Sequence, residues 1–291
     1  MKQKPINAHT GIYGIIGHPV RHTFSPSMHN GAFQACGVDA RYLVFEVCPG
    51  SLKQAVHGLR ALGVSGFNVT IPHKEAIIAC LDSLDREAEI IGAVNTVKNI
   101  RGTLKGYNTD GEGFVTALRK SGVSPGGKRV VMIGAGGAAR AVSVYLARGG
   151  IKTLTLADAA DRRAQSLAKA LKKHFPRTET RVTGASKAAL SREARQADIL
   201  INATPVGMKK SDPLLVDKTV LKPSLVVCDL VYNPPETRLL REAKQSGCTV
   251  MNGIGMLLYQ GVAAFEIWTG VVAPTGVMKK ALLSQVERKH R

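Results

Sequence analysis

A glycine-rich stretch, GAGGAAR at residues 134–140, follows an apolar run at 130–133 and leads into a sequence with helical spacing. Strand, glycine turn and helix in this order suit a dinucleotide, because glycines allow a tight turn and free amides at a helix start hold a pyrophosphate. The residues predicted to line this turn are Gly134, Ala135, Gly136, Gly137 and Ala138. A second apolar run ends at Asp158, at the distance where a ribose-binding carboxylate is expected. An ordinary turn after a core strand is the simpler alternative, and the position of Asp158 favours the nucleotide.

Two hydroxyl side chains, Thr23 and Ser25, stand where a helix is predicted to begin with Pro26 as its first residue. Hydroxyls beside the free amides and the positive dipole end of a helix suit a bound carboxylate. N-capping of the helix by Ser25 is the commoner explanation of such a serine. The pattern therefore indicates either an anion site or a cap.

Thr70 and Lys74 lie where an apolar strand at 64–71 meets Pro72 and the hydrophobic spacing changes from 2 to 3.6. This strand-to-helix junction is where α/β sheets commonly bind ligands. An isolated lysine in the first turn of a helix would instead be exposed to solvent. Further along, Asn95 and Asp110 stand beside turn residues, where Asn95 suits a turn and Asp110 suits the N-cap of a helix at 111–121.

The elements that must position these residues alternate between strand and helix. In the first part, strands are predicted at 11–17, 41–47 and 64–71, and the segment 121–129, rich in glycine, serine and proline, is predicted to be a linker. After the glycine turn the predicted elements are helix 137–148, strand 153–158, helix 161–174, strands 197–204 and 225–232, helix 236–246, strand 248–253, and helices 255–270 and 275–288. The alternation predicts an α/β protein with parallel sheets, and Thr204, Pro205 and Gly207 form a loop after a strand.

The composition fits an intracellular globular protein. With 291 residues, of which 44% are hydrophobic, the chain is long enough for two domains with their own cores. Its five cysteines are scattered without a CxxC pair, which argues against a disulfide framework and against a structural zinc site. This cysteine usage fits a reducing cytoplasm. A polar start and the lack of a long apolar run predict no signal segment and no membrane association.

The formal net charge of +19 is unevenly distributed. Residues 1–110 hold 11 Lys and Arg against 8 Asp and Glu, whereas residues 111–291 hold 29 against 13. The excess falls in the nucleotide-like part and suits a small anionic ligand. Nucleic-acid binding is not expected, because the basic residues are dispersed, aromatic residues make up only 5%, and no nucleic-acid motif occurs.

Seven motifs occur in one order and carry a resemblance to a known family. They are NVTIPHK at 68–74, GAVNT at 92–96, GYNTDGEG at 106–113, GAGGAAR at 134–140, NATPVGM at 202–208, DLVYNPPET at 229–237 and GMLLYQGVAAFEIWTG at 255–270. The chain resembles the shikimate dehydrogenase family, with its quinate dehydrogenase relatives, from about residue 12 to residue 285. The resemblance implies an α/β substrate-binding catalytic domain at 1–110 with returning helices at 256–291, and a Rossmann-like, doubly wound dinucleotide-binding domain at 111–255.

The resemblance also implies roles for single residues. Lys74 would transfer the proton beside Asp110, while Thr23 and Ser25 grip the substrate carboxylate, with Tyr232 lining that end. Ring hydroxyls would be bound by Asp110 and Asn95, with Thr70 and Gln260 completing these contacts. Cofactor contacts would come from the glycine turn and from Asp158, Arg163, Thr204, Pro205, Val206 and Gly253. No metal is implied, because Asn95 and Asp110 lack a cluster of ligands to complete a site.

The implied reaction is hydride transfer between NAD and the ring alcohol of shikimate, a cyclic polyol carboxylate, in aromatic amino acid biosynthesis. Two alternatives remain: quinate dehydrogenase, and a nucleotide-binding regulatory protein with little catalysis, against which the intact Lys74 and Asp110 argue. A homodimer is one option for the assembly, and neither nucleic acid nor membrane is an expected partner.

Two departures from the family pattern bear on specificity. Relatives that use NADP usually carry an Asn-Arg-Thr type of sequence where this chain has Asp158 followed by two alanines. An acid there can accept hydrogen bonds from the ribose hydroxyls of NAD and would repel the 2′-phosphate of NADP. Arg162 or Arg163 could instead bind that phosphate, so NADP is a second candidate cofactor. Thr23 stands where strict shikimate dehydrogenases have a serine, so its methyl group narrows the carboxylate site and leaves shikimate, quinate and an amino analogue as candidate substrates.

Overall fold

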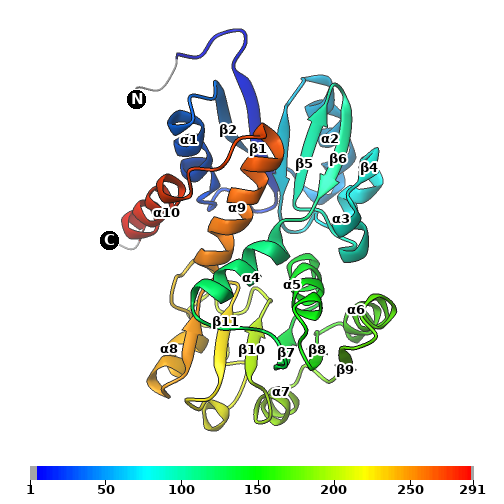
Figure 1. Cartoon of the computed structure of the whole chain (residues 1–291), viewed down its shortest axis with the longest axis vertical. Helices are drawn as coiled ribbons and strands as arrows, with labels where there is room; N and C mark the ends of the chain where they lie inside the picture. Colours follow the sequence, from blue (N-terminus) through cyan, green and yellow to red (C-terminus); the bar gives the residue numbers. More distant parts are fainter. Residues whose placement is uncertain (1–4, 290–291) are drawn as a thin grey trace. The chain divides into compact units, whose positions relative to one another are not determined.

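The computed structural model describes residues 5–289, which form two compact units (Figure 1). The first unit holds the described residues up to Thr109 together with those from Leu258 onward, and the second is Asp110–Leu257. Helix α9 (Gly253–Thr269) begins in the second unit and ends in the first. Within the described residues each unit contains one six-stranded sheet, so the predicted α/β class is confirmed.

The sheet of the first unit has the strand order β2-β1-β3-β5-β6-β4. Its strands are β1 (Gly11–Gly17), β2 (Ala40–Glu46), β3 (Gly66–Val69), β4 (Ser83–Leu84), β5 (Thr96–Ile100) and β6 (Thr103–Tyr107). Strands β1, β2 and β3 are parallel, whereas β5 is antiparallel to both β3 and β6. The carboxyl ends of β1, β3 and β6 and the amino end of β5 therefore share one edge of the sheet.

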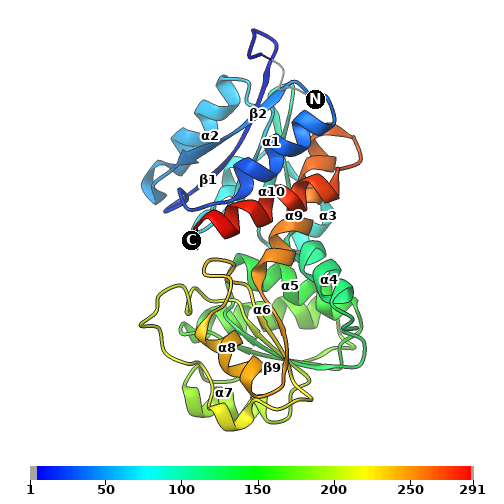
Figure 2. The ribbon, with the colours of Figure 1, turned by 90° about the vertical axis from the view of Figure 1, so that its left-hand side faces the viewer.

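Helices cover this sheet, and α1 and α10 contact each other although they come from opposite ends of the chain (Figure 2). The helices are α1 (Ser25–Ala35), α2 (Leu52–Ala61), α3 (Arg86–Ile91) and α10 (Thr275–Lys289), with 3-10 turns η1 (Pro49–Ser51) and η2 (Ala76–Cys80). The edge strand β2 is protected, since the side-chain amide of Asn30 accepts from the Tyr42 amide at 2.9 Å and donates to its carbonyl at 3.0 Å. This contact occupies backbone groups that an edge strand would otherwise expose.

The prediction of a helix after Pro72 is wrong. Instead, the 3-10 turn η2 is followed by the short strand β4, which pairs with β6. The Asp82 carboxylate accepts from the Leu104 amide at 2.6 Å, and the Asp85 amide donates to the Gly106 carbonyl at 2.9 Å. This tertiary pairing outweighs the helical spacing of the apolar residues, because propensity is only a weak preference.

His29, on α1, is fully buried in an aromatic cluster of the first unit. Its ring stacks on Tyr42 with centroids 4.5 Å apart and lies 5.2 Å from Trp268. Within the described chain neither ring nitrogen has a hydrogen-bond partner, and burial lowers the pKa of His29 to about 3. The folded protein therefore keeps this imidazole neutral.

His29 makes the stability of the protein sensitive to acid. Below pH 6.5, the ordinary pKa, the unfolded chain takes up a proton that the folded chain does not, so stability falls as pH drops toward the folded pKa. From pH 6.5 to 5 the His29 contribution to this loss should be roughly 2 kcal/mol, so the wild type should lose about that much more stability than His29→Phe. Urea unfolding at both pH values measures this difference. Replacing the exposed His57 by Gln should leave the loss unchanged, and an equal loss in His29→Phe would contradict the assignment.

The sheet of the second unit is parallel throughout, with the order β12-β11-β10-β7-β8-β9. Its strands are β7 (Arg129–Ile133), β8 (Thr153–Ala157), β9 (Glu179–Val182), β10 (Ile199–Asn202), β11 (Val226–Asp229) and β12 (Thr249–Met251). Its other helices are α4 (Asp110–Lys120), α5 (Gly137–Arg148), α6 (Asp161–His174), α7 (Lys187–Ala194) and α8 (Arg238–Gln245), with the 3-10 turn η3 (Lys218–Val220). The predicted bounds of α5 and α6 are confirmed, whereas β9 and α7 lay outside the prediction because both are short and rich in polar residues.

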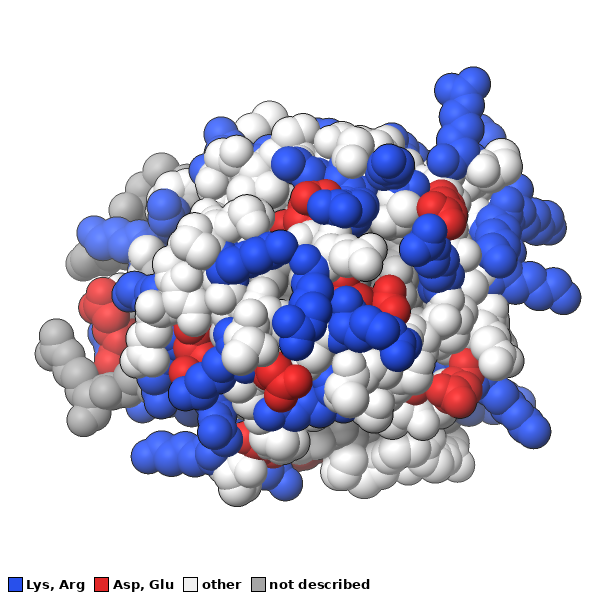
Figure 3. Space-filling model, turned by 90° about the horizontal axis from the view of Figure 1, so that it is seen from below, with Lys and Arg blue, Asp and Glu red and all other residues white. Residues whose placement is uncertain are grey.

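The basic residues are spread over the surface. Lys and Arg side chains cover much of the face in Figure 3, with Asp and Glu between them. Several of these charges form ion pairs, such as exposed Lys218 with half-buried Glu242 at 2.6 Å and Arg241 with Glu236, both exposed, at 3.2 Å. In the part of the chain that the structure describes, no helix has the length and apolar character needed to cross a membrane.

Candidate active site

The segments that follow β1 and β3 pass each other closely in the first unit. The amide of His18 donates to the carbonyl of Ile71 at 2.9 Å. A Cβ atom on Gly17 would collide with the Thr70 side chain and lie 3.1 Å from the Ile71 carbonyl. Glycine is therefore required at position 17, and Thr70 is held beside the end of β1.

Thr23 and Ser25 lie at the start of α1, but Ser25 is not its N-cap. Ser25 is the first helical residue, and Phe24 occupies the cap position without a side-chain hydrogen bond. The Thr23 hydroxyl accepts from the Ser25 amide at 3.2 Å and donates to the Ser25 hydroxyl at 3.1 Å. The capping explanation of Ser25 is therefore wrong, and Thr23 holds the first turn of the helix.

Asn95 is the centre of a buried polar network at the same sheet edge. Its amide nitrogen donates to the Thr109 hydroxyl at 2.9 Å and to the side-chain oxygen of Gln260 at 3.3 Å. Its amide oxygen accepts from the Thr109 amide and from the Thr96 hydroxyl, both at 2.9 Å. The structure thus brings two predicted residues, Asn95 and Gln260, into contact.

The network extends to Asn68 and Tyr42, which the sequence analysis missed. Asn68 donates to the Thr96 hydroxyl at 3.1 Å and accepts from the Tyr42 hydroxyl at 2.7 Å. A buried asparagine within a strand costs free energy unless its amide is paired, and this cost is the signal that marks Asn68. Sequence alone does not show which partners satisfy it.

The main chain around Lys74 is fixed from two sides. The Lys74 carbonyl accepts from the Val94 amide at 2.8 Å, and the ring of His73 donates through Nε2 to the Val47 carbonyl at 2.7 Å. Lys74 is half-buried and lies in the turn before η2, not in the first turn of an α-helix as predicted. Rigid backbone support of this kind suits a residue that must meet a substrate in one position.

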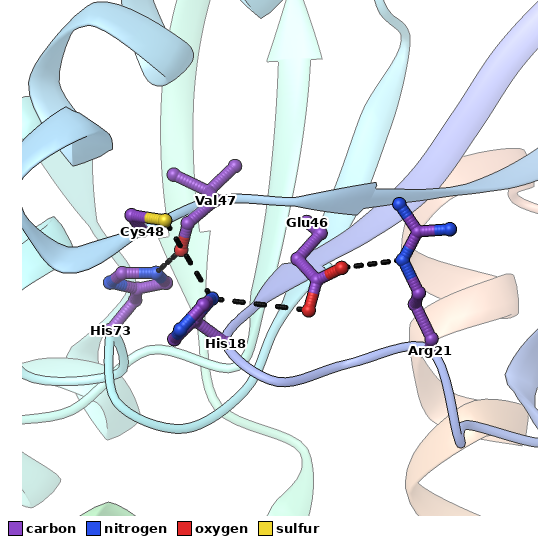
Figure 4. A network of polar contacts seen from close by, with 6 residues as sticks. All are labelled: His18, Arg21, Glu46, Val47, Cys48 and His73. Carbon is purple, nitrogen blue, oxygen red and sulfur yellow. Dashed lines mark hydrogen bonds and ion pairs between the residues drawn. The ribbon is translucent and has the colours of Figure 1, made fainter.

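A chain of polar side chains lies beside His73 (Figure 4). His18 Nδ1 is 3.9 Å from Glu46 Oε1 and 3.8 Å from the Cys48 sulfur. The other Glu46 oxygen accepts from Arg21 Nε at 2.5 Å, and this hydrogen bond lowers the pKa of the Glu46 carboxyl. These contacts join the loop after β1 to the end of β2.

The glycine turn of the second unit lies where strand order reverses between β7 and β10, the switch point at which such sheets bind ligands. Gly134 has φ +106°, and a Cβ there would lie 3.0 Å from the Ala203 carbonyl and 3.1 Å from Thr204 Cγ2. The turn after β7 therefore packs directly against the loop after β10, and only glycine fits.

Asp158 holds this turn with both carboxylate oxygens. One oxygen accepts from the Ala135 amide at 2.7 Å and the other from the Ala160 amide at 2.9 Å. The Gly134 amide is also used, since it donates to the Ala157 carbonyl at 2.7 Å. The amides of Gly134 and Ala135 are thus occupied within the protein. The amides at the start of α5 are the ones that suit a phosphate, because the first amides of a helix have no partner within the helix.

The donor set of this turn fits a dinucleotide. The guanidinium of Arg163, in the first turn of α6, lies 3.5 Å from where a Cβ of Gly136 would stand. A cation, helix-start amides and an uncrowded glycine backbone match a pyrophosphate, and the Asp158 oxygens keep lone pairs for ribose hydroxyls. Within the described residues no group of three or more His, Cys, Asp or Glu could hold a metal ion.

The loop after β10 contains the predicted residues Thr204, Pro205 and Val206. The Asn202 side chain organises it, accepting from the Thr204 amide at 3.0 Å and hydroxyl at 2.7 Å and donating to the Val206 carbonyl at 2.8 Å. Asn202 is fully buried at the end of β10 and was missed by the sequence analysis.

Tyr232 and Gly253 lie beyond the end of β11. Tyr232 is half-buried, and the Gly253 amide donates to the Val231 carbonyl at 3.1 Å. A Cβ on Gly253 would collide with the Leu230 carbonyl, so α9 starts in close contact with the segment after β11. Asp110 is the first residue of α4 and belongs to the second unit, whereas Lys74 belongs to the first, so their convergence on one substrate atom stays a prediction.

Comparisons with known proteins match both units. A family model described as "Shikimate dehydrogenase substrate binding domain" matches residues 15–97, "Saccharopine dehydrogenase NADP binding domain" matches 130–251, and "Shikimate 5'-dehydrogenase C-terminal domain" matches 253–283. A shikimate dehydrogenase (NADP(+)) of Methanopyrus kandleri is 49% identical over 97% of this chain and 98% of its own. The chain belongs to the shikimate dehydrogenase family.

Solved structures of the family have the same fold. A shikimate dehydrogenase in complex with NADP+ matches with a TM-score of 0.90 and 43% identity, covering 98% of each chain. The enzyme of Listeria monocytogenes in complex with shikimate and NAD matches with a TM-score of 0.86 and 40% identity, covering 96% of this chain and 98% of its own. Both nicotinamide dinucleotides therefore occur among structures of relatives.

Replacing Gly134 by Ala should weaken dinucleotide binding at least tenfold, because the new methyl group would push the turn away from Ala203 and Thr204. Titration of NADH fluorescence measures the dissociation constant. Gly127→Ala is the matched control, since Gly127 also has a positive φ, +70°, but open space around its Cβ position. Both variants carry backbone strain of roughly 1–3 kcal/mol, so equal binding losses would show that strain alone is responsible.

Proposed function

We propose that the protein transfers a hydride between a nicotinamide dinucleotide and the ring alcohol of shikimate, interconverting shikimate and 3-dehydroshikimate. The observation that carries this proposal is full-length membership of the shikimate dehydrogenase family, with 49% identity to a relative that bears this name. The polar sheet edge of the first unit and the dinucleotide-compatible turn of the second support it. In this proposal the first unit provides most of the groups that bind the substrate, and the second provides the dinucleotide turn together with Asp110 and Tyr232.

Lys74 and Asp110 carry the proton chemistry in this proposal. Oxidation of a secondary alcohol needs a base that removes the hydroxyl proton, and reduction of the ketone needs an acid that returns it. A lysine amino group serves both directions, and the Asp110 carboxylate orients that amino group and the substrate hydroxyl. The dinucleotide, when bound, accepts and returns the hydride.

The remaining polar residues orient the ring. Thr23, Ser25 and Tyr232 bind the carboxylate, while Thr70 and Gln260 bind ring hydroxyls. Because Asn95 donates to the Gln260 side-chain oxygen, it fixes which way the Gln260 amide group points. Asn95 therefore orients Gln260 in this proposal, in addition to the ring-hydroxyl contact that the family resemblance implies for Asn95 itself.

NAD is the preferred dinucleotide in this proposal. Asp158 is held by two backbone amides at the end of β8, so its charge stays close to the adenosine ribose. A 2′-phosphate would meet this negative charge, at a cost on the order of 4 kcal/mol for two unit charges 4 Å apart near a protein surface. Arg162 and Arg163 reduce this penalty, and NADP therefore remains a weaker cofactor.

Lys74→Ala should lower turnover of shikimate by about 10² to 10⁴, the usual contribution of general acid–base catalysis, while leaving NADH binding within twofold of wild type. Steady-state kinetics with shikimate and NAD, together with fluorescence titration of NADH, measure the two effects. Lys53→Ala, which removes an exposed lysine of α2, is the control and should keep full turnover. Near-normal turnover in Lys74→Ala would refute the proton-transfer role.

The ratio of kcat/KM for NAD to that for NADP should exceed ten in the wild type and fall at least tenfold in Asp158→Asn, because the substitution removes the charge that repels the 2′-phosphate. Asp161→Asn removes a nearby acid from the first turn of α6 and should leave the ratio unchanged. A wild-type protein that prefers NADP would show that the arginines outweigh Asp158.

The same assays, run with shikimate and quinate in parallel, settle the substrate. Faster turnover of quinate would make the protein a quinate dehydrogenase, an outcome that the Thr23 methyl group makes worth testing. Binding of dinucleotide without turnover of either substrate would favour a regulatory protein of the same fold.

A further inference from the structure

Asp229 is a buried carboxylate that the proposed mechanism does not use. It ends β11 with a side chain only 1% exposed, directly beside Asn202 at the end of β10. One of its oxygens accepts from Asn202 Nδ2 at 2.9 Å and from the Val231 amide at 3.0 Å. The other accepts from the Thr237 hydroxyl at 2.7 Å.

These bonds connect three segments of the second unit. Asn202 holds the loop of Thr204 and Val206, and Val231 starts the segment after β11. Thr237 is the N-cap of α8, since its hydroxyl also accepts from the Leu240 amide at 3.3 Å. Asp229 therefore links the start of α8 to the loop after β10 by hydrogen bonds through Asn202.

The same loop also packs directly on Thr237. Gly207 has φ +110°, and a Cβ there would lie 3.1 Å from Thr237 Cγ2 and 3.7 Å from an Asp229 oxygen. At its other end the loop touches the glycine turn, where Gly134 leaves no room for a Cβ against Ala203 and Thr204. A shift at Thr237 would therefore pass along the loop to the dinucleotide turn.

Burial is expensive for this carboxylate. Desolvation raises the pKa of Asp229 to about 6, against the three hydrogen bonds, which lower it. An apolar residue would avoid this penalty if the position served only to fill the core. A buried acid with all its donors in place fixes the geometry of its neighbours, because leaving any donor unpaired is costly.

We infer that Asp229 and Thr237 form a positioning pair, which holds the loop at 203–207 in the shape that the dinucleotide requires. The cap of α8 is then part of the cofactor site without touching the cofactor. The inference rests on the proposed function only in taking a nicotinamide dinucleotide as the ligand.

Thr237→Val tests the pair, because valine keeps the shape of threonine and removes the hydroxyl. The dissociation constant of NADH and the KM for the dinucleotide should rise at least tenfold, while kcat at saturating dinucleotide stays within about threefold. Thr237→Ser restores the hydroxyl and should bind NADH within twofold of wild type. Fluorescence titration and steady-state kinetics give both readouts.

Ser186→Ala is the matched control, since Ser186 caps α7 in the same way, accepting from the Ala189 amide at 3.3 Å, but lies outside this network. It loses a helix cap as Thr237→Val does and should leave NADH binding unchanged. If Thr237→Val binds NADH as tightly as Ser186→Ala does, Thr237 is only a cap and the inference fails.

Asp229→Asn gives a second test should Thr237→Val fold poorly, with folding checked by circular dichroism. Asparagine keeps the shape but replaces one acceptor with a donor, so NADH binding should again weaken at least tenfold. The double variant should bind NADH about as weakly as Asp229→Asn alone, because paired residues act as one unit. Fully additive losses would contradict the pair.

The wild-type measurements separate this inference from the proposed function. A wild type that binds NADH but does not oxidise shikimate would refute the proposed function and leave the binding comparison valid. A wild type that binds neither NADH nor NADPH would overturn the positioning pair itself.

Discussion

The candidate binding residues of each unit depend on one constraint of sheet geometry: parallel strands deliver the residues that follow them to the same edge of their sheet. In the first unit β2 and β3 lie on opposite sides of β1. The direction in which successive strands are added to the sheet therefore reverses between β1 and β3. In the second unit β8 and β10 flank β7 in the same way. At each reversal the loops after the two strands hold residues that we propose to bind a ligand, such as Thr70 after β3 and Thr204 after β10.

In each unit two of these loops also approach each other so closely that only glycine fits at the contact. Gly17 lets Thr70 lie against the end of β1, and Gly134 lets the turn after β7 lie against Ala203. In both places a methyl group would separate loops that must present their polar groups together. The glycines act through the absence of a side chain, and we therefore expect their substitution to weaken binding more than the loss of any single contact would.

Buried polar networks then fix the loops in place. Asn95 uses its amide nitrogen and oxygen on Thr109, Gln260 and Thr96, and Asp229 uses both oxygens on Asn202, Val231 and Thr237. Because such groups are costly to bury unpaired, each network has one preferred arrangement. This arrangement holds in place the residues that we propose to bind the substrate and the dinucleotide.

Much of this could be predicted from the sequence because it depends on local patterns. Helices α5 and α6 follow directly from apolar spacing and flanking turn residues, and the glycine turn is marked by its own composition. The segment at 76–85 could not be predicted, since pairing of β4 with β6 and the bonds of Asp82 and Asp85 come from distant residues. The hydrogen-bond partners of Asn68, Asn202 and Asp229 could not be predicted for the same reason. A polar residue within an apolar strand can be recognised in a sequence, but the distant groups that hydrogen-bond to it cannot.

The proposed reaction requires that the Lys74 amino group and the Asp110 carboxylate meet at the reacting alcohol of the substrate. A crystal structure of the protein with NAD and shikimate tests it most directly. We expect Lys74 Nζ to lie roughly 2.6–3.2 Å from one ring hydroxyl oxygen, with Asp110 within hydrogen-bond distance of the same hydroxyl. Nicotinamide C4 should face the carbon that carries this hydroxyl. A ternary complex in which Lys74 points away from that hydroxyl would contradict the claim.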